Sequence, residues 1–332
     1  MIERIEFKNY KALRSAVLPL GRFTLIVGPN GSGKTTALRA LTSILTPANF
    51  PHALLATAGS AEDVSVSVNW GEPYAGLITK ANWSRVNATS LEWLDPEGRP
   101  IIDGRMAPLQ RLLQKYRIYT LDSEEIAKPV TLNPTIELAD TGTGLAVVLD
   151  QLRDRSSDRW KALNAELPRW FGEYDQIVFD TPSEGKRAFA LRTRAGERIP
   201  AEQCSQGTLL ALTILTLAHL PDPPPVIGFE EPDRGIHPRL LREVQDALYR
   251  LAYPEGGAES RAPIQVIATT HSPYLLDLFK DHPEEIVIAQ RNGADANFER
   301  LSDHPHLDQI LDGASLGEVW FTGILGGVPV AP

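Results

Sequence analysis

One short stretch constrains the fold of this chain more than any other. It reads Gly28-Pro29-Asn30-Gly31-Ser32-Gly33-Lys34-Thr35-Thr36, which is a glycine, four further residues and then Gly-Lys-Thr. The apolar run 23–27 before it is expected to be a buried strand, and 37–41 after it has a helical pattern. A strand, a glycine-rich turn and a helix in this order are typical of a loop that holds phosphate.

Each residue type in this phosphate loop has a chemical reason. Glycine lets the backbone turn tightly and point its N–H groups at phosphate oxygens, where a Cβ would block the approach. Lys34 is expected to contact the β and γ phosphates, and Thr35 to offer its hydroxyl to Mg²⁺. The helix that follows turns its positive end toward the anion. The sequence therefore predicts a site for a nucleoside triphosphate.

Composition and charge exclude several classes of protein. The chain has 332 residues with 42% hydrophobic content, enough for a sizeable core and two lobes. No apolar run approaches the roughly 18 residues of a membrane helix, and the N-terminus lacks a secretion signal. The single cysteine, Cys204, excludes a disulfide framework and a cysteine-rich zinc site, and we expect it to be buried. We therefore expect a cytoplasmic protein without membrane contact.

Charge leaves nucleic-acid binding open. The 33 basic and 42 acidic residues give a net charge of −9, which argues against a positively coated protein but is compatible with a local basic groove. On a helix predicted from 144 to 159, acids at 150, 154 and 158 recur beside arginines, and we interpret them as a solvated, ion-paired face. Lys8 and Lys11 are expected to be exposed strand lysines rather than nucleotide contacts.

The remaining pattern predicts an α/β protein. We expect two or three short strands within 2–27, an antiparallel sheet from strands 65–70, 75–79 and 90–94, a helix at 109–116, paired strands at 176–180 and 188–193, and a helix at 209–220. The apolar C-terminal run 315–327 is either a docking segment or, as we favour, a tail that folds back onto its own domain.

A possible second phosphate contact precedes the helix at 209–220. The residues there are Ser205, Gln206 and Gly207. A serine in this place is most often only a helix N-cap. A serine with a glycine two residues on can also bind a γ-phosphate of a second subunit through its hydroxyl, the backbone amides and the helix dipole. Both interpretations stay open.

Two carboxylates, Glu230 and Glu231, end the predicted strand that begins at Val226. Adjacent unpaired acids at a buried strand end are costly unless a cation or water accompanies them. Mg²⁺ would remove that cost, with Glu230 holding the metal through its waters and Glu231 polarising the water that attacks the γ-phosphate. The alternative is an ordinary strand end at the surface.

A histidine follows the predicted strand 265–270, in the segment Thr270-His271-Ser272-Pro273. The carboxyl ends of strands in an open parallel sheet face the ligand crevice. His271 can therefore donate to the γ-phosphate or position the water. The alternative is an incidental histidine, which is the usual case for a single histidine after a strand.

Together, these segments resemble the heads of ATP-binding-cassette (ABC) ATPases, in the branch that contains RecF, the chromosome-structure proteins and the overcoming-lysogenisation-defect (OLD) nucleases. Residues 230–238, Glu-Glu-Pro-Asp-Arg-Gly-Ile-His-Pro, look like that branch's Glu-Pro-Glu-Asn-x-Leu-His-Pro, and 270–273 look like its switch-histidine segment. The resemblance implies an α/β head with a mixed central sheet, an antiparallel β lobe and an α-helical subdomain. It also implies ATP and Mg²⁺ as cofactors and two copies that close head to tail, with Ser205, Gln206 and Gly207 of one copy against the nucleotide of the other.

The chain also departs from the family pattern. Glu230 stands where the metal-site residue is more commonly Asp, the Ser-Gln-Gly motif is shorter than in transporters, and the glutamine of the Q-loop is not assigned among Gln110, Gln114 and Gln151. We expect the ATPase head to comprise 1–50 and 171–332, with a β/helical lobe inserted at 51–170.

Three functions remain in view. Since 41–190 sustains no heptads, we expect no long coiled-coil arms. OLD nucleases carry a nuclease domain after the head, and we expect none after the 270–273 segment here. Any nuclease is therefore expected on a separate effector chain. The leading hypothesis is an ATPase that dimerises around ATP and drives or gates a complex acting on DNA, in repair or anti-phage defence. The second is an ATP-operated switch or scaffold with little turnover, which binds its partner through 51–170. The third, a transporter motor, fits the motifs less well.

Overall fold

The computed structural model divides the chain into two compact units. The structure describes residues 1–86, 88–101, 106–133, 135–254, 261–293, 295–305, 307, 315–323 and 325. The first unit comprises Met1–Tyr116 and Gln265–Pro332, and the second comprises Arg117–Ile264. These bounds differ from those of the predicted head and inserted lobe, and the functional division into head and lobe stays a prediction.

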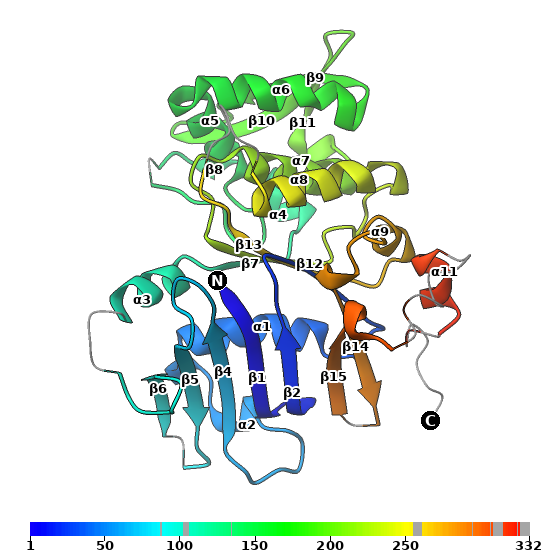
Figure 1. Cartoon of the computed structure of the whole chain (residues 1–332). Coiled ribbons are helices and arrows are strands. Elements are labelled where there is room, and N and C mark those ends of the chain that lie inside the picture. The colour runs from blue at the N-terminus through cyan, green and yellow to red at the C-terminus, as the bar shows by residue number, and fades with distance from the viewer. Residues whose placement is uncertain are drawn as a thin grey trace. The chain divides into compact units, whose positions relative to one another are not determined.

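A five-stranded antiparallel sheet forms one layer of the first unit (Figure 1). Its strand order is β2-β1-β4-β5-β6, with β1 Ile2–Tyr10, β2 Leu13–Pro19, β4 Val64–Trp70, β5 Ile78–Trp83 and β6 Thr89–Leu94. Leu13, Ala16 and Leu18 of β2 are buried with exposed residues between them, as expected for a strand that is covered on one face. The predicted antiparallel strands are confirmed, but the strand predicted at 75–79 begins only at Ile78, because Tyr74 and Leu77 donate backbone hydrogen bonds that close turns before it.

Parallel strands carry the phosphate loop in the same unit. β3 Phe23–Val27 pairs in parallel with β13 Gln265–Thr270 on one side and β14 Ile286–Asn292 on the other, and β15 Asp295–Arg300 runs antiparallel to β14. All residues of β3 and β13 are buried, which is typical of parallel strands covered on both faces. The predicted strands at 23–27 and 265–270 are confirmed.

Helix α1, Lys34–Leu45, follows the phosphate loop and confirms the helix predicted there. It runs across one face of the five-stranded sheet, behind β1 and β2 in Figure 1. Tyr10 of β1 and Ser43 of α1 share a buried hydrogen bond of 3.0 Å, so the helix is fixed to that sheet.

The C-terminal run packs onto its own unit where the structure describes it. Helix α11, Leu316–Phe321, contacts α9, Pro273–Asp277, and Gly317 N donates a 2.7 Å hydrogen bond to Asp277 Oδ1. Val319 and Trp320 are buried. This packing agrees with the interpretation of a tail that folds back, while residues 324, 326 and 327 of that run lie outside the described residues.

The second unit is built around helix α7, Gln206–His219. All of its residues from Leu209 to His219 are buried, as expected for a helix that is apolar on every side. The helices around it are α4 Ser123–Ala127, α6 Ser157–Phe171 and α8 Leu241–Ala252, with α5 Leu145–Arg155 against α4 and α6. α7 confirms the helix predicted from 209 to 220.

Two sets of strands complete the second unit. β7 Arg117–Tyr119 pairs in parallel with β12 Val226–Glu230. β10 Lys186–Thr193 pairs in antiparallel fashion with β9 Tyr174–Asp180, β11 Arg198–Pro200 and β8 Val130–Thr131. The predicted strand pair of 176–180 and 188–193 is confirmed. Other short helices in the chain are α2 His52–Leu55, α3 Met106–Gln114 and the 3-10 turns Pro47–Asn49, Ala201–Gln203, Pro238–Leu240, Pro283–Glu285 and Leu301–Asp303.

The helix predicted from 144 to 159 is two helices. Ser156, with φ of −141°, leaves the helical region and separates α5 from α6. The interpretation of a solvated acidic face is also wrong for Asp150, which is buried and pairs with Arg153 at 2.7 Å and Arg187 at 3.1 Å. A carboxylate that faces β10 cannot belong to a water-exposed helix face.

A group of charged side chains joins three helices of the second unit. Glu166 of α6 accepts hydrogen bonds from Arg250 of α8 at 2.6 and 3.0 Å, and its Oε1 lies 2.9 Å from Nε2 of the buried His219 of α7. Burial alone raises the pKa of Glu166, but the hydrogen bonds from His219 and Arg250 and the charge of Arg250 outweigh it and bring the pKa to about 2. This carboxylate therefore stays ionised and holds α6, α7 and α8 together.

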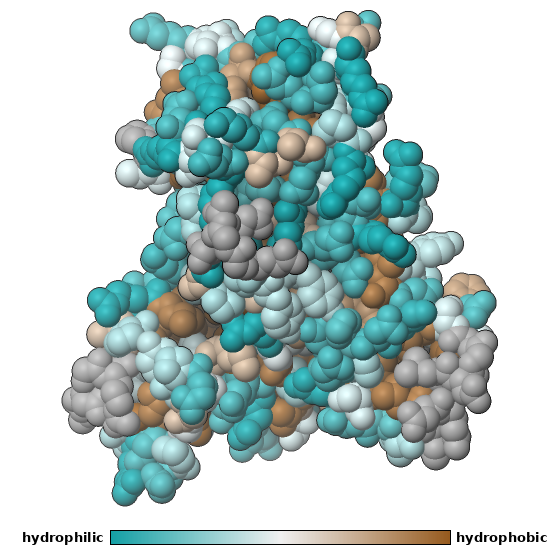
Figure 2. Space-filling view, turned by 45° about the horizontal axis from the view of Figure 1, so that its top comes forward, coloured by the Kyte–Doolittle hydropathy of each residue, from teal (hydrophilic) through white to brown (hydrophobic). Residues whose placement is uncertain are grey.

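In the part of the chain that the structure describes, none of the helices combines the length and the apolar character that a membrane crossing requires. The face in Figure 2 is mostly hydrophilic, and hydrophobic residues appear on it only in separate places.

Candidate functional site

The phosphate loop has a backbone that only glycines allow. Gly31 and Gly33 have φ of 79° and 93°, in the left-handed region. A Cβ on Gly28 would lie 2.6 Å from the carbonyl oxygen of Ala289 and 2.4 Å from Ser32 Oγ. The three glycines therefore let the chain turn between β3 and α1 with no side chain in the way.

Lys34 lies on the inner side of this loop. Its side chain is buried, and Nζ donates hydrogen bonds to the carbonyl oxygens of Gly28 at 2.6 Å and Pro29 at 3.0 Å. Ser32 Oγ is also buried and has no hydrogen-bond partner among the described residues. Thr35 and Asn30 are exposed, and Thr36 is half-buried. An ammonium group and an unsatisfied hydroxyl inside a glycine turn fit an anionic ligand such as a phosphate.

The strand that precedes His271 lies directly beside the phosphate loop. β13 is paired with β3 so that Thr270 is opposite Val27, and Gly28 N donates to Thr270 O at 3.4 Å. Ser272 N donates to Thr270 Oγ1 at 3.0 Å, and Ser272 caps α9. His271, which is exposed, follows Thr270 at this same sheet edge. The structure thus brings together the two predicted site segments of the first unit.

Arg291 was not predicted as a site residue. It lies on β14, the other neighbour of β3, and a Cβ built on Gly31 would be 3.6 Å from Arg291 Nη1. Its Nε donates a hydrogen bond to Gly293 O at 2.9 Å. The sequence contains no signal for this placement, because it depends on which strand pairs with β3.

The acidic pair lies in the second unit, at the end of β12. Glu230 is half-buried, and its Oε2 accepts a hydrogen bond of 2.6 Å from Thr120 Oγ1. Thr120 follows β7, the parallel neighbour of β12. Thr120 was also missed, since β7 lies within the region predicted to be an inserted lobe. None of Gln110, Gln114 and Gln151, the three Q-loop candidates, is in this place, since two are on α3 and one is on α5.

Glu231 has an unusual backbone conformation. Its φ is 49°, in the left-handed region, where a residue with a Cβ costs on the order of 1–2 kcal/mol. Arg234 holds the turn, because its N donates to Glu231 O and its Nη2 to Leu121 O, both at 3.0 Å. Strained positions of this kind are concentrated at functional sites. The strained conformation agrees with the predicted role of Glu231.

Ser205 is the N-cap of helix α7, which is one of the two interpretations given for it above. Its Oγ accepts a hydrogen bond from Thr208 N at 3.1 Å. Ser205 and Gln206 are exposed, while Gly207 lies so close to the loop after Glu231 that a Cβ on it would be 2.5 Å from Gly235 O. The start of α7 and the loop that follows the acidic pair are therefore in contact within the second unit. A contact with a second copy stays a prediction.

The two predicted magnesium ligands are Thr35 in the first unit and Glu230 in the second. Among the residues that the structure describes, no group of three His, Cys, Asp or Glu side chains is arranged to hold a metal. Mg²⁺ does not need one, since it retains waters and uses one or two carboxylates together with substrate phosphates. The Glu230 carboxylate and the exposed Thr35 hydroxyl are suitable donors of this kind.

Cys204 is half-buried rather than fully buried as predicted. Burial, with smaller contributions from the charges of Glu173 and Glu202, raises the pKa of its thiol to about 11. A thiol that stays protonated at neutral pH is a poor nucleophile.

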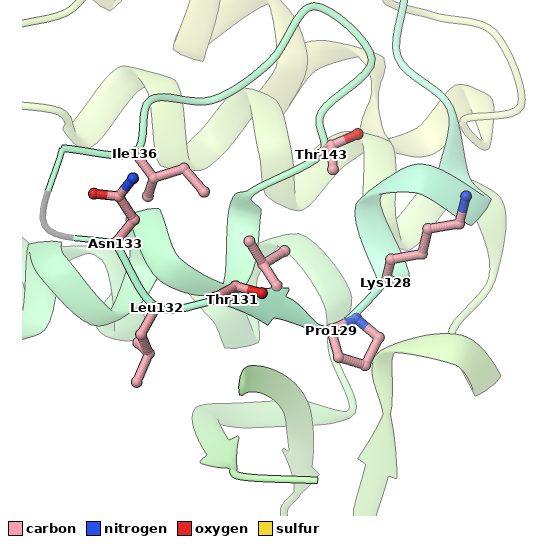
Figure 3. A pocket seen from close by; sticks show the side chains of 8 residues that line it. Lys128, Pro129, Thr131, Leu132, Asn133, Ile136 and Thr143 are labelled. Carbon is pink, nitrogen blue, oxygen red and sulfur yellow. The ribbon is translucent and has the colours of Figure 1, made fainter. Parts of the chain in front are cut away.

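A cavity of about 560 Å³ lies elsewhere in the second unit, near β8 (Figure 3). Leu132 and Ile136 are among its lining residues, and the polar ends of Lys128, Asn133 and Thr143 lie apart in Figure 3. Lys128 and Thr143 both bond to Glu125. The cavity includes no predicted site residue, and its polar groups do not converge on a ligand.

Comparison with solved structures identifies the fold. The chain is similar to an SMC head bound to the C-winged helix domain of ScpA, with a TM-score of 0.62 and 15% identity over 90% of this chain and 96% of that one. It is also similar to the SMC head domain from Thermotoga maritima, with a TM-score of 0.54 and 13% identity over 90% and 98% of the two chains. The fold is that of an ABC-type ATPase head, as predicted.

Comparison with sequence families identifies the class more closely. Residues 71–277, more than half of the chain, match the family described as "AAA domain, putative AbiEii toxin, Type IV TA system", and 1–91 match the "AAA ATPase domain". The chain belongs to the first of these two families, whose match covers more than half of it. A segment of 45 residues is 53% identical to an OLD nuclease from Thermus scotoductus (strain ATCC 700910 / SA-01), a match that covers 14% of this chain and only 8% of that relative. The predicted resemblance to SMC heads is confirmed in the fold, and the predicted resemblance to OLD nucleases is confirmed over this segment.

Proposed function

We propose that this protein binds ATP together with Mg²⁺ at the phosphate loop and hydrolyses it. The observation that carries this proposal is the buried Lys34 ammonium inside a loop whose glycines leave no side chain between the backbone and a phosphate. The backbone N–H groups, Lys34 and the nearby Arg291 bind the phosphates. The family match to an AAA ATPase domain over 1–91 supports the choice of nucleotide.

For the hydrolysis step, we assign each predicted residue one task. Thr35 and Glu230 hold Mg²⁺, which when bound offsets the negative charge on the phosphates. Glu231 orients and polarises the attacking water, and His271 donates to the γ-phosphate or positions that water. The sheet edge shared by Gly28 and Thr270 supports the role of His271.

We further propose that two copies close head to tail around ATP and that hydrolysis reopens them. The exposed Ser205 and Gln206 at the start of α7 are suited to meet a γ-phosphate held by the partner. The similarity of a segment to an OLD nuclease supports a role in a complex that acts on DNA, in repair or anti-phage defence, with a separate effector such as a nuclease. In the second hypothesis the same closure works as a switch with little turnover.

Binding and turnover should be measured separately with purified protein. We expect ATP binding by calorimetry and phosphate release above background, and we expect Lys34→Ala to weaken ATP binding by roughly 10–100-fold, since a charged hydrogen bond contributes about 1.5–3 kcal/mol. Lys161→Ala, a change on the exposed face of α6, is the control and should behave as wild type. Tight ATP binding with background turnover would favour the switch, and unchanged binding by Lys34→Ala would contradict the site.

A further inference from the structure

The hydrogen bond between Thr120 and Glu230 joins the ends of two neighbouring parallel strands. β7 and β12 are paired so that Tyr119 is opposite Phe229, and the next residue of each strand provides one partner of the bond. At 2.6 Å the two oxygens are as close as in a hydroxyl-to-carboxylate bond, which is shorter than one between neutral groups. Glu230 is thus the acceptor of a strong bond at the edge where parallel strands present ligand-binding residues.

The position of the Thr120 hydroxyl is fixed by its surroundings. Thr120 N donates to Asp140 O at 2.9 Å, which sets the backbone. Tyr119 and Phe229 are the last paired residues of the two strands. Their rings are stacked with centroids 5.6 Å apart, and both are almost fully buried. Because threonine is branched at Cβ, its χ1 angle has few accessible values. The hydroxyl is therefore held in place before any ligand arrives.

A fixed hydroxyl proton restricts how the carboxylate can turn. A glutamate side chain has three rotatable bonds, and a carboxylate has about four lone-pair directions. A bond from Thr120 to Oε2 selects one rotational state of Glu230. Partners that orient a metal-binding carboxylate typically change metal affinity or activity by 10–100-fold when they are removed.

We propose that Thr120 is a positioning residue for Mg²⁺ in this protein: it does not bind the metal, but it holds the Glu230 carboxylate in the orientation that does. This inference rests on the proposed function, because it takes Glu230 as the acidic residue of the magnesium site. It assigns a role to a residue of the 117–121 segment, which the sequence analysis placed in the inserted lobe 51–170.

The competing explanation is that the bond only ties β7 to β12. The two explanations differ in what the loss of the hydroxyl changes. A strand tie affects the free energy of unfolding and leaves metal affinity alone, whereas a positioning role affects metal affinity in the folded protein. Thr120→Val keeps the shape and removes the hydroxyl, and Thr120→Ser keeps the hydroxyl, so this pair of variants separates the two explanations.

The experiment measures Mn²⁺ binding to the protein with a non-hydrolysable ATP analogue by electron paramagnetic resonance, with nucleotide affinity in EDTA measured alongside. We expect Thr120→Val to weaken Mn²⁺ binding by roughly 10–100-fold, Thr120→Ser to stay within about threefold of wild type, and all variants to bind nucleotide equally in EDTA. Thr131→Val, on the exposed edge strand β8, is the control. Circular dichroism checks that each variant is folded.

Two results would overturn the inference, and they are distinguishable. If Thr120→Val binds Mn²⁺ as tightly as wild type, Thr120 only ties the strands, and the proposed ATPase is unaffected. If wild-type protein binds neither the nucleotide nor Mn²⁺ with it, the proposed function itself is wrong and the role of Thr120 is wrong with it.

Discussion

Gly28 N donates a hydrogen bond of 3.4 Å to Thr270 O, which joins the first residue of the phosphate loop to the last residue of the strand before His271. This relationship follows from the parallel pairing of β3 with β13. It places the beginning of the predicted phosphate site and the predicted switch histidine on adjacent strand ends, although they are far apart in the sequence.

His271→Ala is expected to lower the rate of ATP hydrolysis by roughly 100-fold, which is within the range of a lost general acid or base. ATP affinity should change by less than about threefold, because Lys34 and the loop backbone remain. Phosphate release and calorimetry measure the two quantities. His282→Ala, a change at an exposed histidine that pairs with Glu284, is the control. An unchanged rate for His271→Ala would remove this residue from the mechanism.

Arg291→Ala is expected to raise the dissociation constant for ATP by roughly 10-fold, about 1.4 kcal/mol, with little effect on adenosine. The dissociation constant of Arg291→Lys for ATP should lie between those of wild type and Arg291→Ala, since an ammonium cannot make the bidentate hydrogen bonds of a guanidinium to phosphate. Arg14→Ala serves as the control, because Arg14 pairs with Asp295 on the same unit. Equal ATP affinity of wild type and Arg291→Ala would show that the guanidinium beside Gly31 does not contact the nucleotide.

Gly207→Ala is expected to destabilise the protein, although alanine in a helix ordinarily stabilises it by up to about 1 kcal/mol. The new Cβ would lie 2.5 Å from Gly235 O, a backbone atom that cannot move aside cheaply. We expect a net loss of about 1–3 kcal/mol in urea denaturation, typical of overpacking. A gain in stability would mean that the start of α7 does not press against the loop after Glu231.

Glu166→Gln is expected to lower the free energy of unfolding by at least about 2 kcal/mol at neutral pH, because it leaves Arg250 and His219 without their carboxylate. The pKa of Glu166 falls from its usual 4.5 in the unfolded chain to about 2 in the folded one. Its contribution is therefore complete above about pH 4.5 and is lost as pH falls toward 2.

The difference in stability between wild type and Glu166→Gln should accordingly shrink between pH 4.5 and 2, measured by urea denaturation at several pH values. Glu184→Gln, a change at an exposed glutamate, is the control and should show no such trend. A difference that stays constant over this range would contradict the pKa assigned to Glu166.

The parts of the site that the sequence predicts are those encoded by short local patterns. The glycines of the phosphate loop, the acidic pair after an apolar strand and the histidine after another are each recognisable within a few residues. Their strands, β3, β12 and β13, are confirmed. Each carries a short buried apolar run, which is typical of parallel strands covered on both faces.

Thr120 and Arg291 could not be predicted, because their positions depend on pairing between distant strands. Thr120 contacts Glu230 because β7 pairs with β12, and Arg291 lies near the phosphate loop because β14 pairs with β3. The sequence carries no local mark of these pairings. The break of the 144–159 helix at Ser156 was missed for a different reason. The acids at 150, 154 and 158 keep a four-residue spacing across the break, and no glycine or proline marks it.

Glu231→Gln tests the central claim most directly, which is that this chain hydrolyses ATP between two closed copies. Hydrolysis and molar mass are measured on the same samples, by phosphate release and light scattering, with ATP and Mg²⁺ present, and Glu137→Gln, at an exposed glutamate that pairs with Arg117, serves as the control. We predict that Glu231→Gln hydrolyses ATP at least roughly 100-fold more slowly than wild type and accumulates as an ATP-bound dimer. A wild-type rate with no dimer in ATP would contradict the account.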